Sequence, residues 1–266
     1  MFKDNMLLQS RLSFTFLSFK ALYSYNSLKL FIFFRFLDPF IHYLFFAMIT
    51  TSIVGSEYLT YVILGNIAFY TGRELFQNFI SIFRYERRFG TLSLNVAAPL
   101  PTFVILIKKS VVPLLDSLFI FIISVLMAYV MFDVSFSWQS FWLLCGAGVI
   151  MVFALFGAAL LIAGISLLFS NVNLFVNLLF AGFQLLCGVN FPVSLLPDFL
   201  QNISNILPLT HSVELIRDIQ AGQNERIYHL ALAELSIGAV YFIIAILLIG
   251  LMEKYAKQTG RLFDNE

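Results

Sequence analysis

The chain has 266 residues, of which 60% are hydrophobic and only 12% are charged, and its mean hydropathy is +0.90. Soluble domains carry about 25% charged residues, so this composition excludes an ordinary soluble globular protein. The two cysteines, Cys145 and Cys187, lie in apolar runs, which favours buried thiols over a disulfide or metal ligands. Composition therefore predicts an all-α integral membrane protein that crosses the bilayer several times.

The N-terminal segment contains an amphipathic pattern. Leu12, Phe16 and Tyr23 recur on one helical face, and polar side chains lie on another. This pattern predicts an interfacial helix over residues 9–30 that rests on membrane lipids, although a simple lead-in to the first span is the alternative. No apolar core followed by a small-residue cleavage site precedes Arg35, so we expect the segment to remain attached.

Six apolar windows follow, each suited to a helix of about 20 residues that crosses a bilayer. They cover residues 37–55, 58–82, 110–132, 139–168, 172–191 and 231–252. Small residues between 154 and 164 predict close helix packing in the fourth window. We expect residues 1–266 to form a single transmembrane domain.

Lys and Arg residues are distributed unevenly between the two sides. Of the 16, the connections on one side hold 13, those on the other hold Arg217 and Arg226, and Arg73 lies within a span. Because cytoplasmic loops are enriched in basic residues, we expect both termini in the cytoplasm, in agreement with an even number of spans.

Two connections are too long to be simple turns. The cytoplasmic connection predicts a helix over residues 84–100 that ends at the prolines Pro99 and Pro101. The external connection contains an apolar run of about 13 residues between prolines, which is too short to cross the bilayer. It therefore predicts short re-entrant helices over residues 192–208 in the outer leaflet.

Polar side chains form a stripe on each of two otherwise apolar spans. The stripes consist of Asn66, Tyr70, Arg73 and Gln77 in the second span and Asn173, Asn177 and Gln184 in the fifth. A bare arginine that faces lipid costs about 2.5 to 3.5 kcal/mol, so we expect these faces to turn toward protein or water and to line a translocation path. Hydrogen bonding between packed helices is the alternative.

The sequence lacks the motifs of an enzyme. His42, His211 and His229 are scattered without the spacing of metal ligands, and no nucleophile motif is present. The chain also has no GxxxxGK[ST] phosphate loop. We therefore expect no catalytic, cofactor or metal site in this chain, and any dependence on ATP must come from a partner.

Two further segments resemble a known family. The stretch ERRFGTLSLNVAAPLP, from Glu86 to Pro101, resembles the E-R-x-x-G-T-L signature of ABC transporter type-2 permeases. The stretch GVNFPVSLLPDFLQNISNILPLTHSVELIRDI, from Gly188 to Ile219, resembles the family's external segment between spans five and six. The resemblance covers nearly the whole chain and implies the transmembrane subunit of a bacterial ATP-driven exporter.

The resemblance also implies partners and site residues. It implies a homodimer of permease chains, bound to two copies of a separate ATP-binding subunit that holds ATP and Mg, in the bacterial cytoplasmic membrane and without a nucleic-acid partner. Residues that would couple to that subunit are Arg84, Glu86, Arg87, Arg88, Phe89, Gly90, Thr91 and Leu92, and the external gate would include Phe191, Pro192 and Pro197. An ordinary basic loop that only sets topology is the alternative for the coupling segment.

The end of the external segment bears on the substrate class. The ending PLTHSVELIRD resembles drug, antibiotic and peptide exporters, which implies an amphipathic drug, antibiotic, natural product or peptide. Export of a lipid-linked glycan or lipid is the alternative. A second alternative is a different class of protein, a carrier or membrane enzyme that works without ATP. Its charged centre would consist of Arg73, Glu74 and Asp116.

Overall fold

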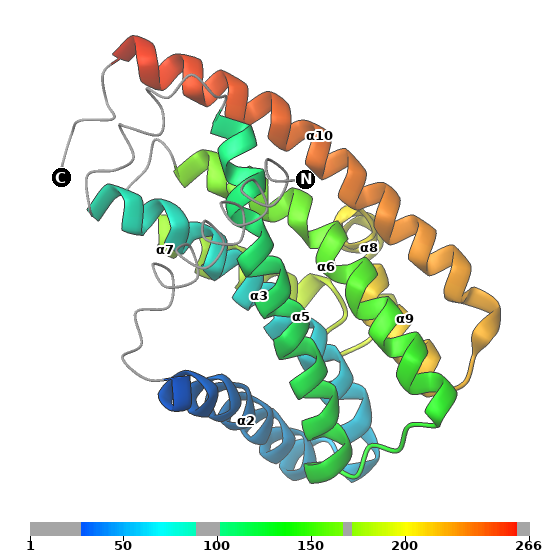
Figure 1. The fold of residues 1–266 in the computed structure, drawn as a ribbon. Coiled ribbons are helices and arrows are strands. Elements are labelled where there is room, and N and C mark those ends of the chain that lie inside the picture. The colour runs from blue at the N-terminus through cyan, green and yellow to red at the C-terminus, as the bar shows by residue number, and fades with distance from the viewer. Residues whose placement is uncertain (1–27, 89–101, 167–171, 260–266) are drawn as a thin grey trace, which may run out of the picture.

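A computed structural model describes residues 28–88, 102–166 and 172–259, and within these ranges it is helical without β-strands. The long helices are α2 (Leu28–Ile53), α3 (Leu59–Arg88), α5 (Thr102–Met131), α6 (Trp138–Ser166), α7 (Val172–Leu186) and α10 (Ile227–Thr259). The short ones are η1 (Ser56–Tyr58), η2 (Val193–Leu195), α8 (Asp198–Ile206), α9 (Thr210–Gln220) and η3 (Asn224–Arg226). In Figure 1, α2 and α10 lie at opposite edges of the bundle.

Each of the six predicted spans corresponds to a helix, but within the described ranges four helices are both long and apolar enough to cross a membrane by length and composition. These four are α2, α5, α6 and α10. Helix α3 carries Arg73 and Glu74 at its centre, and α7 has only 15 residues, which is about 22 Å of helix against a hydrocarbon core of about 30 Å.

The ends of several helices differ from the predicted boundaries. Helix α2 begins at Leu28 rather than at residue 37, so Arg35 belongs to this helix and not to a lead-in. Only residues 28–30 of the predicted interfacial helix are described, and they form the start of α2. Helix α5 begins at Thr102, so the basic pair of residues 108–109 lies inside the helix, where long side chains can extend toward an interface.

The predicted fifth span, 172–191, is wrong at its C-terminal end. Helix α7 ends at Leu186, because Gly188 adopts a left-handed backbone conformation with φ of 70° and the chain then turns toward Pro192. Residues after Leu186 therefore leave the helix and enter the external connection.

Close packing of α6 against α10 confirms the prediction made from small residues. A Cβ atom at Gly157 would lie 2.6 Å from the carbonyl oxygen of Gly238, and one at Gly238 would collide with Ala154. Such glycines let two backbones approach where any larger side chain would separate them. The core of the bundle is built around α6, with α10 on one side and α3 on another.

The external connection contains more helix than the sequence predicts. Helix α8 and the 3-10 turn η2 lie within the predicted re-entrant segment 192–208, and α9 follows it as an additional helix. Most of the apolar side chains of α9 are buried against α3, α6 and α10, whereas α8 exposes Phe199, Ile203 and Ile206. Helix α9 is thus part of the packed bundle and α8 lies at its surface.

Candidate functional site: polar networks along α3

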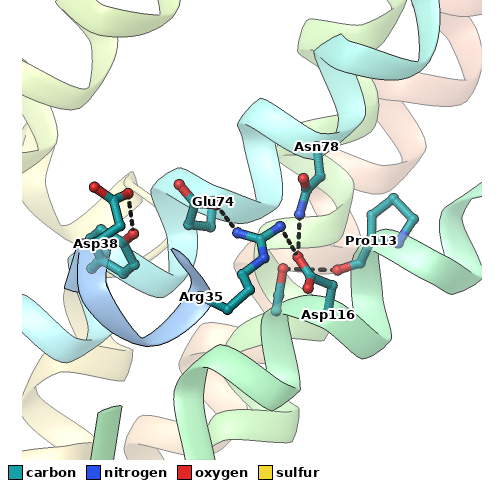
Figure 2. Close-up of polar contacts among 8 residues, drawn as sticks. Arg35, Asp38, Glu74, Asn78, Pro113 and Asp116 are labelled. Carbon is teal, nitrogen blue, oxygen red and sulfur yellow. Dashed lines mark hydrogen bonds and ion pairs between the residues drawn. The ribbon is translucent and has the colours of Figure 1, made fainter. Parts of the chain in front are cut away.

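The first network is a group of ionic contacts that joins the helices α2, α3 and α5 (Figure 2). Arg35 of α2 donates from Nη1 to Glu74 Oε2 of α3 at 2.5 Å and from Nη2 to Asp116 Oδ2 of α5 at 2.6 Å. Asn78 of α3 donates to the same oxygen of Asp116 at 2.7 Å. One guanidinium thus compensates two carboxylates that are largely hidden from solvent, with side-chain exposures of 17% and 6%.

A second set of polar contacts continues along the same side of α3. Tyr70 donates its hydroxyl to Asp38 at 2.7 Å, and His42 Nε2 lies 3.2 Å from Asn66 Oδ1. Asn66 also donates to the side-chain oxygen of Asn190 at 2.9 Å, which connects α2 and α3 to the segment after α7. These contacts extend from the centre of α3 to its N-terminal half.

The register of these contacts explains why they form one network. Asn66, Tyr70, Glu74 and Asn78 are spaced by four residues, so they form a continuous row on α3. The partners of this row lie on α2, where Arg35, Asp38 and His42 are spaced by three and four residues and so also form one row. The sequence analysis missed the α2 row, although its helical spacing within an apolar run was the signal that could have revealed it.

The predicted path residues of α3 therefore divide into two groups. Asn66 and Tyr70 are buried, and they use their polar atoms within the chain. Arg73 and Gln77 are partly exposed. Within the described ranges Arg73 has no hydrogen bond or ion pair, while its charge and that of Asp38 both act on the His42 ring. The charged centre of Arg73 with Glu74 and Asp116 is not formed, because Arg35 takes both carboxylates.

The other predicted path residues lie on α7, next to α3. Asn177 is exposed and Gln184 is partly exposed, and the side chain of Asn173 lies outside the described residues. Helices α3 and α7 meet through aromatic rings, since Phe69 and Phe180 stand edge to face with centroids 5.6 Å apart. An apolar contact thus joins α3 to α7.

A third network holds the helices of the predicted external connection between α7 and α10. Arg217 of α9 donates to the carbonyl oxygens of Tyr61 at 3.0 and 3.2 Å and of Gly188 and Val189 at 2.7 Å each. The sequence analysis used this arginine only as an external charge for topology. Its side chain instead connects α9 to the start of α3 and to the segment after α7.

Glu234 of α10 is hydrogen-bonded to the N-terminal end of α9. Its buried carboxylate accepts hydrogen bonds from the backbone N–H groups of Leu209 at 2.8 Å and Ser212 at 3.2 Å, at the N-terminal end of α9. A helix N-terminus favours negative charge, which compensates the buried carboxylate. Leu209 has a φ of 119°, a strained conformation for leucine that this anchor helps to maintain.

The predicted coupling and gate residues are placed only in part. Arg84 is an exposed residue of α3, and the backbone from Glu86 to Arg88 forms the end of the same helix, so this part belongs to α3 rather than to a separate helix over 84–100. The rest of the predicted coupling segment, Phe89, Gly90, Thr91 and Leu92, lies outside the described residues. Of the gate residues, Phe191 is partly exposed and Pro192 and Pro197 are exposed.

Across the described ranges, no three His, Cys, Asp or Glu side chains form an arrangement that could hold a metal ion. Cys145 and Cys187 are free thiols. What the geometry offers is a set of buried polar contacts that joins helices, together with a partly exposed arginine in the middle of α3.

Comparison with known proteins identifies the family. The family described as ABC-2 type transporter matches residues 14–221. Nodulation protein J of Bradyrhizobium diazoefficiens is 36% identical over 85 residues, which is 31% of this chain and 32% of that protein. Nodulation protein J of Sinorhizobium fredii is 62% identical over 32 residues, or 12% of each chain. These matched segments span a third or less of the curated relatives. The chain belongs to the ABC-2 type transporter family, whose members are membrane permeases that work with an ABC ATP-binding subunit.

Proposed function

We propose that the chain is the permease subunit of an ATP-driven exporter in the bacterial cytoplasmic membrane. It forms the translocation path as a homodimer and binds two copies of an ATP-binding subunit, which holds ATP and Mg. The observation that carries this proposal is the family match over residues 14–221, which spans the E-R-x-x-G-T-L segment and the whole stretch from Gly188 to Ile219. The chain supplies the path and the partner supplies the energy.

In this proposal α3 and α7 cross the membrane together with the four more apolar helices, and both termini lie in the cytoplasm. Helix α3 has 30 residues and is about 45 Å long, more than enough to cross the hydrocarbon core. The charge of Glu74 is tolerated because it is paired with Arg35 inside the protein, and Arg73 is proposed to face the path. Helix α7 is short, at about 22 Å, and the non-helical residues 187–191 continue from its end toward the outer surface.

The translocation path is proposed to run along the partly exposed polar side of α3 and the adjoining side of α7. Arg73 and Gln77 from α3 and Asn177 and Gln184 from α7 are its exposed or partly exposed members. Asn66 and Tyr70 do not line the path in this proposal. Their polar groups are hydrogen-bonded to Asn190 and Asp38, and they hold α3 in place. Polar residues in such positions mark substrate pathways in membrane proteins.

The substrate is proposed to be amphipathic, such as a drug, antibiotic, natural product or peptide. One helical turn from Arg73, the buried ring of Phe69 packs with the rings of His42 and Phe180, so a cluster of aromatic residues lies within one turn of the cation. A cation next to aromatic rings suits a molecule with polar and apolar parts. A lipid-linked glycan or lipid has the same two parts and remains the second candidate.

The external helices are proposed to close the outer end of the path. The exposed apolar residues of η2 and α8, including Leu195 and Phe199, suit insertion into the outer leaflet, as expected for a re-entrant segment. Phe191, Pro192 and Pro197 lie between α7 and α8, where a gate would be placed.

Coupling to the ATP-binding subunit is tested with variants of the segment that continues α3. We expect Glu86→Ala and Gly90→Pro to lower substrate-stimulated ATP hydrolysis by the complex several-fold while the chain still inserts, because the docking contact is lost or its entry angle is changed. The measurement is phosphate release by the reconstituted complex.

The matched control for these variants is Glu57→Ala, since Glu57 is an exposed acidic residue at the opposite end of α3. It should leave hydrolysis unchanged. Wild-type hydrolysis in both coupling variants would contradict the assignment of this segment.

A further inference from the structure

The external helices are attached to the same helix that leads into the coupling segment. We propose that Arg217 is the positioning residue that ties the external helices to α3, so that movement of the cytoplasmic end of α3 is transmitted to the outside. The inference rests on the proposed function, because the movement is driven by the ATP-binding subunit. It assigns a role to a residue that is not among the expected path, coupling or gate residues.

The guanidinium of Arg217 joins three parts of the chain at one point. Nε and Nη2 donate to the carbonyl oxygen of Tyr61, in the first turn of α3, while Nη1 donates to Gly188 and Nη2 also donates to Val189, after α7. The Arg217 Cζ atom lies 3.4 Å from the centre of the Tyr61 ring. Only arginine can make these contacts, because its planar guanidinium donates to three carbonyl oxygens at once and a lysine ammonium cannot reach all three.

The contact is close because α3 carries a glycine where it faces the arginine. A Cβ atom at Gly65 would collide with the Val189 carbonyl oxygen and lie 2.5 Å from Arg217 Nη2. The neighbouring Asn66 donates to Asn190 at 2.9 Å and adds a second connection between the same two segments. Burial lowers the pKa of Arg217 to about 10, so the guanidinium remains charged at neutral pH.

The rest of the external region is fastened to this point. Ser204 of α8 donates to the Leu186 carbonyl oxygen at 2.7 Å, and Thr210 of α9 donates to the Ser204 carbonyl oxygen at 2.7 Å. Helix α8 is therefore bound both to the end of α7 and to α9. We infer that α8, α9 and the segment after α7 move as a unit, and that Arg217 connects this unit to α3.

Helix α3 has the properties of a transmitting element. It runs without proline from Leu59 to Arg88, over about 45 Å, so a displacement at one end is carried to the other. Arg217 is hydrogen-bonded to the external end of α3, and the E-R-x-x-G-T-L segment begins with Glu86 at the cytoplasmic end of the same helix. Packed elements of this kind shift as rigid bodies between discrete arrangements.

The test uses a reporter on the exposed side of α8 in the full complex with its ATP-binding subunit, reconstituted in vesicles. Asn202→Cys places a thiol on α8 in a Cys145→Ala background, because Cys187 is buried and cannot react. The labelling rate with a membrane-impermeant maleimide is measured without nucleotide and after trapping with ATP and vanadate. In the wild-type background we expect the two rates to differ by at least about fivefold.

Arg217→Gln should abolish this difference while the partner still hydrolyses ATP at a near wild-type rate, and Arg217→Lys should not restore it. Arg226→Gln is the matched control, because Arg226 is 64% exposed and its contact with Glu214 is long, at 3.5 Å. It should keep the full difference. Gly65→Ala retains the arginine but separates it from α3, and should also abolish the difference.

The outcomes separate the inference from the proposed function. If the wild-type background transports with ATP but shows no change on trapping, the inference is wrong, whereas a wild-type complex without ATP-dependent transport would mean that the proposed function fails. If the wild-type background responds and Arg217→Gln responds equally, the inference alone is wrong. Loss of both assembly and hydrolysis in Arg217→Gln and in Gly65→Ala would reduce Arg217 to a structural residue and would also contradict the inference.

Discussion

Arg35→Gln is expected to destabilise the folded protein by about 3 to 5 kcal/mol, because it leaves the carboxylates of Glu74 and Asp116 buried without their cation. The loss is large since three helices, α2, α3 and α5, meet at this guanidinium. The measurement is the unfolding midpoint of the purified chain in detergent.

Two further variants isolate the ionic contact. Lys29→Gln removes an exposed cation from the same helix and should leave the midpoint unchanged. The triple variant Arg35→Gln, Glu74→Gln, Asp116→Asn replaces the charges with neutral hydrogen-bonding groups and should recover most of the lost stability. A triple variant no more stable than Arg35→Gln alone would show that the carboxylates are not the source of the loss.

Arg73→Ala should lower the rate of substrate export by at least about tenfold, equivalent to about 1.4 kcal/mol, with no loss of folded protein. The reason is that Arg73 is partly exposed in the middle of α3 and, in the described part of the chain, has no ion pair or hydrogen bond to lose. Removing an arginine from a membrane helix also lowers the cost of insertion. The measurement is the initial rate of ATP-dependent export of a fluorescent amphipathic dye.

Arg73→Lys serves as the control, because it preserves the charge and should retain part of the rate. A packing role predicts the opposite pattern, with reduced folded protein and a normal rate per folded molecule. That pattern would remove Arg73 from the proposed path.

The sequence was sufficient to predict the positions and order of the helices that correspond to the six apolar windows, and close packing in the fourth of them. Apolar windows report helix positions because each helix must bury or expose a continuous apolar surface, and glycine and alanine mark where backbones can meet. Helix ends were less predictable. The start of α2 was missed because Arg35 looked like a charge outside the membrane, whereas it is compensated by two carboxylates from distant helices.

The polar residues of α3 show that residue spacing identifies a helix face but not the helix that this face contacts. The pattern correctly placed Asn66 and Tyr70 on one face, but it could not tell which neighbour that face would meet. In the structure the row continues through Glu74 and Asn78 toward α2 and α5, so Arg73 and Gln77 fall on its edge. Contacts across helices depend on rotation and register, which a single amphipathic pattern leaves open.

Arg217 illustrates the same limit over a longer distance. It lies 156 residues from Tyr61 in the chain, yet its guanidinium binds that residue's carbonyl oxygen. An external arginine in a sequence is naturally taken as a topology signal, because nothing local shows that carbonyl groups from two other segments will surround it. Only the fold brings the start of α3 and the segment after α7 to α9.

The central claim is that this chain forms a path whose transport is driven by a separate ATP-binding subunit. The most direct test is dye transport by the reconstituted complex, measured with the wild-type partner and with a partner whose phosphate-loop lysine is replaced. Transport that requires ATP and stops with the inactive partner is the predicted result. Equal transport with the active partner, with the inactive partner and with the chain alone would contradict the account.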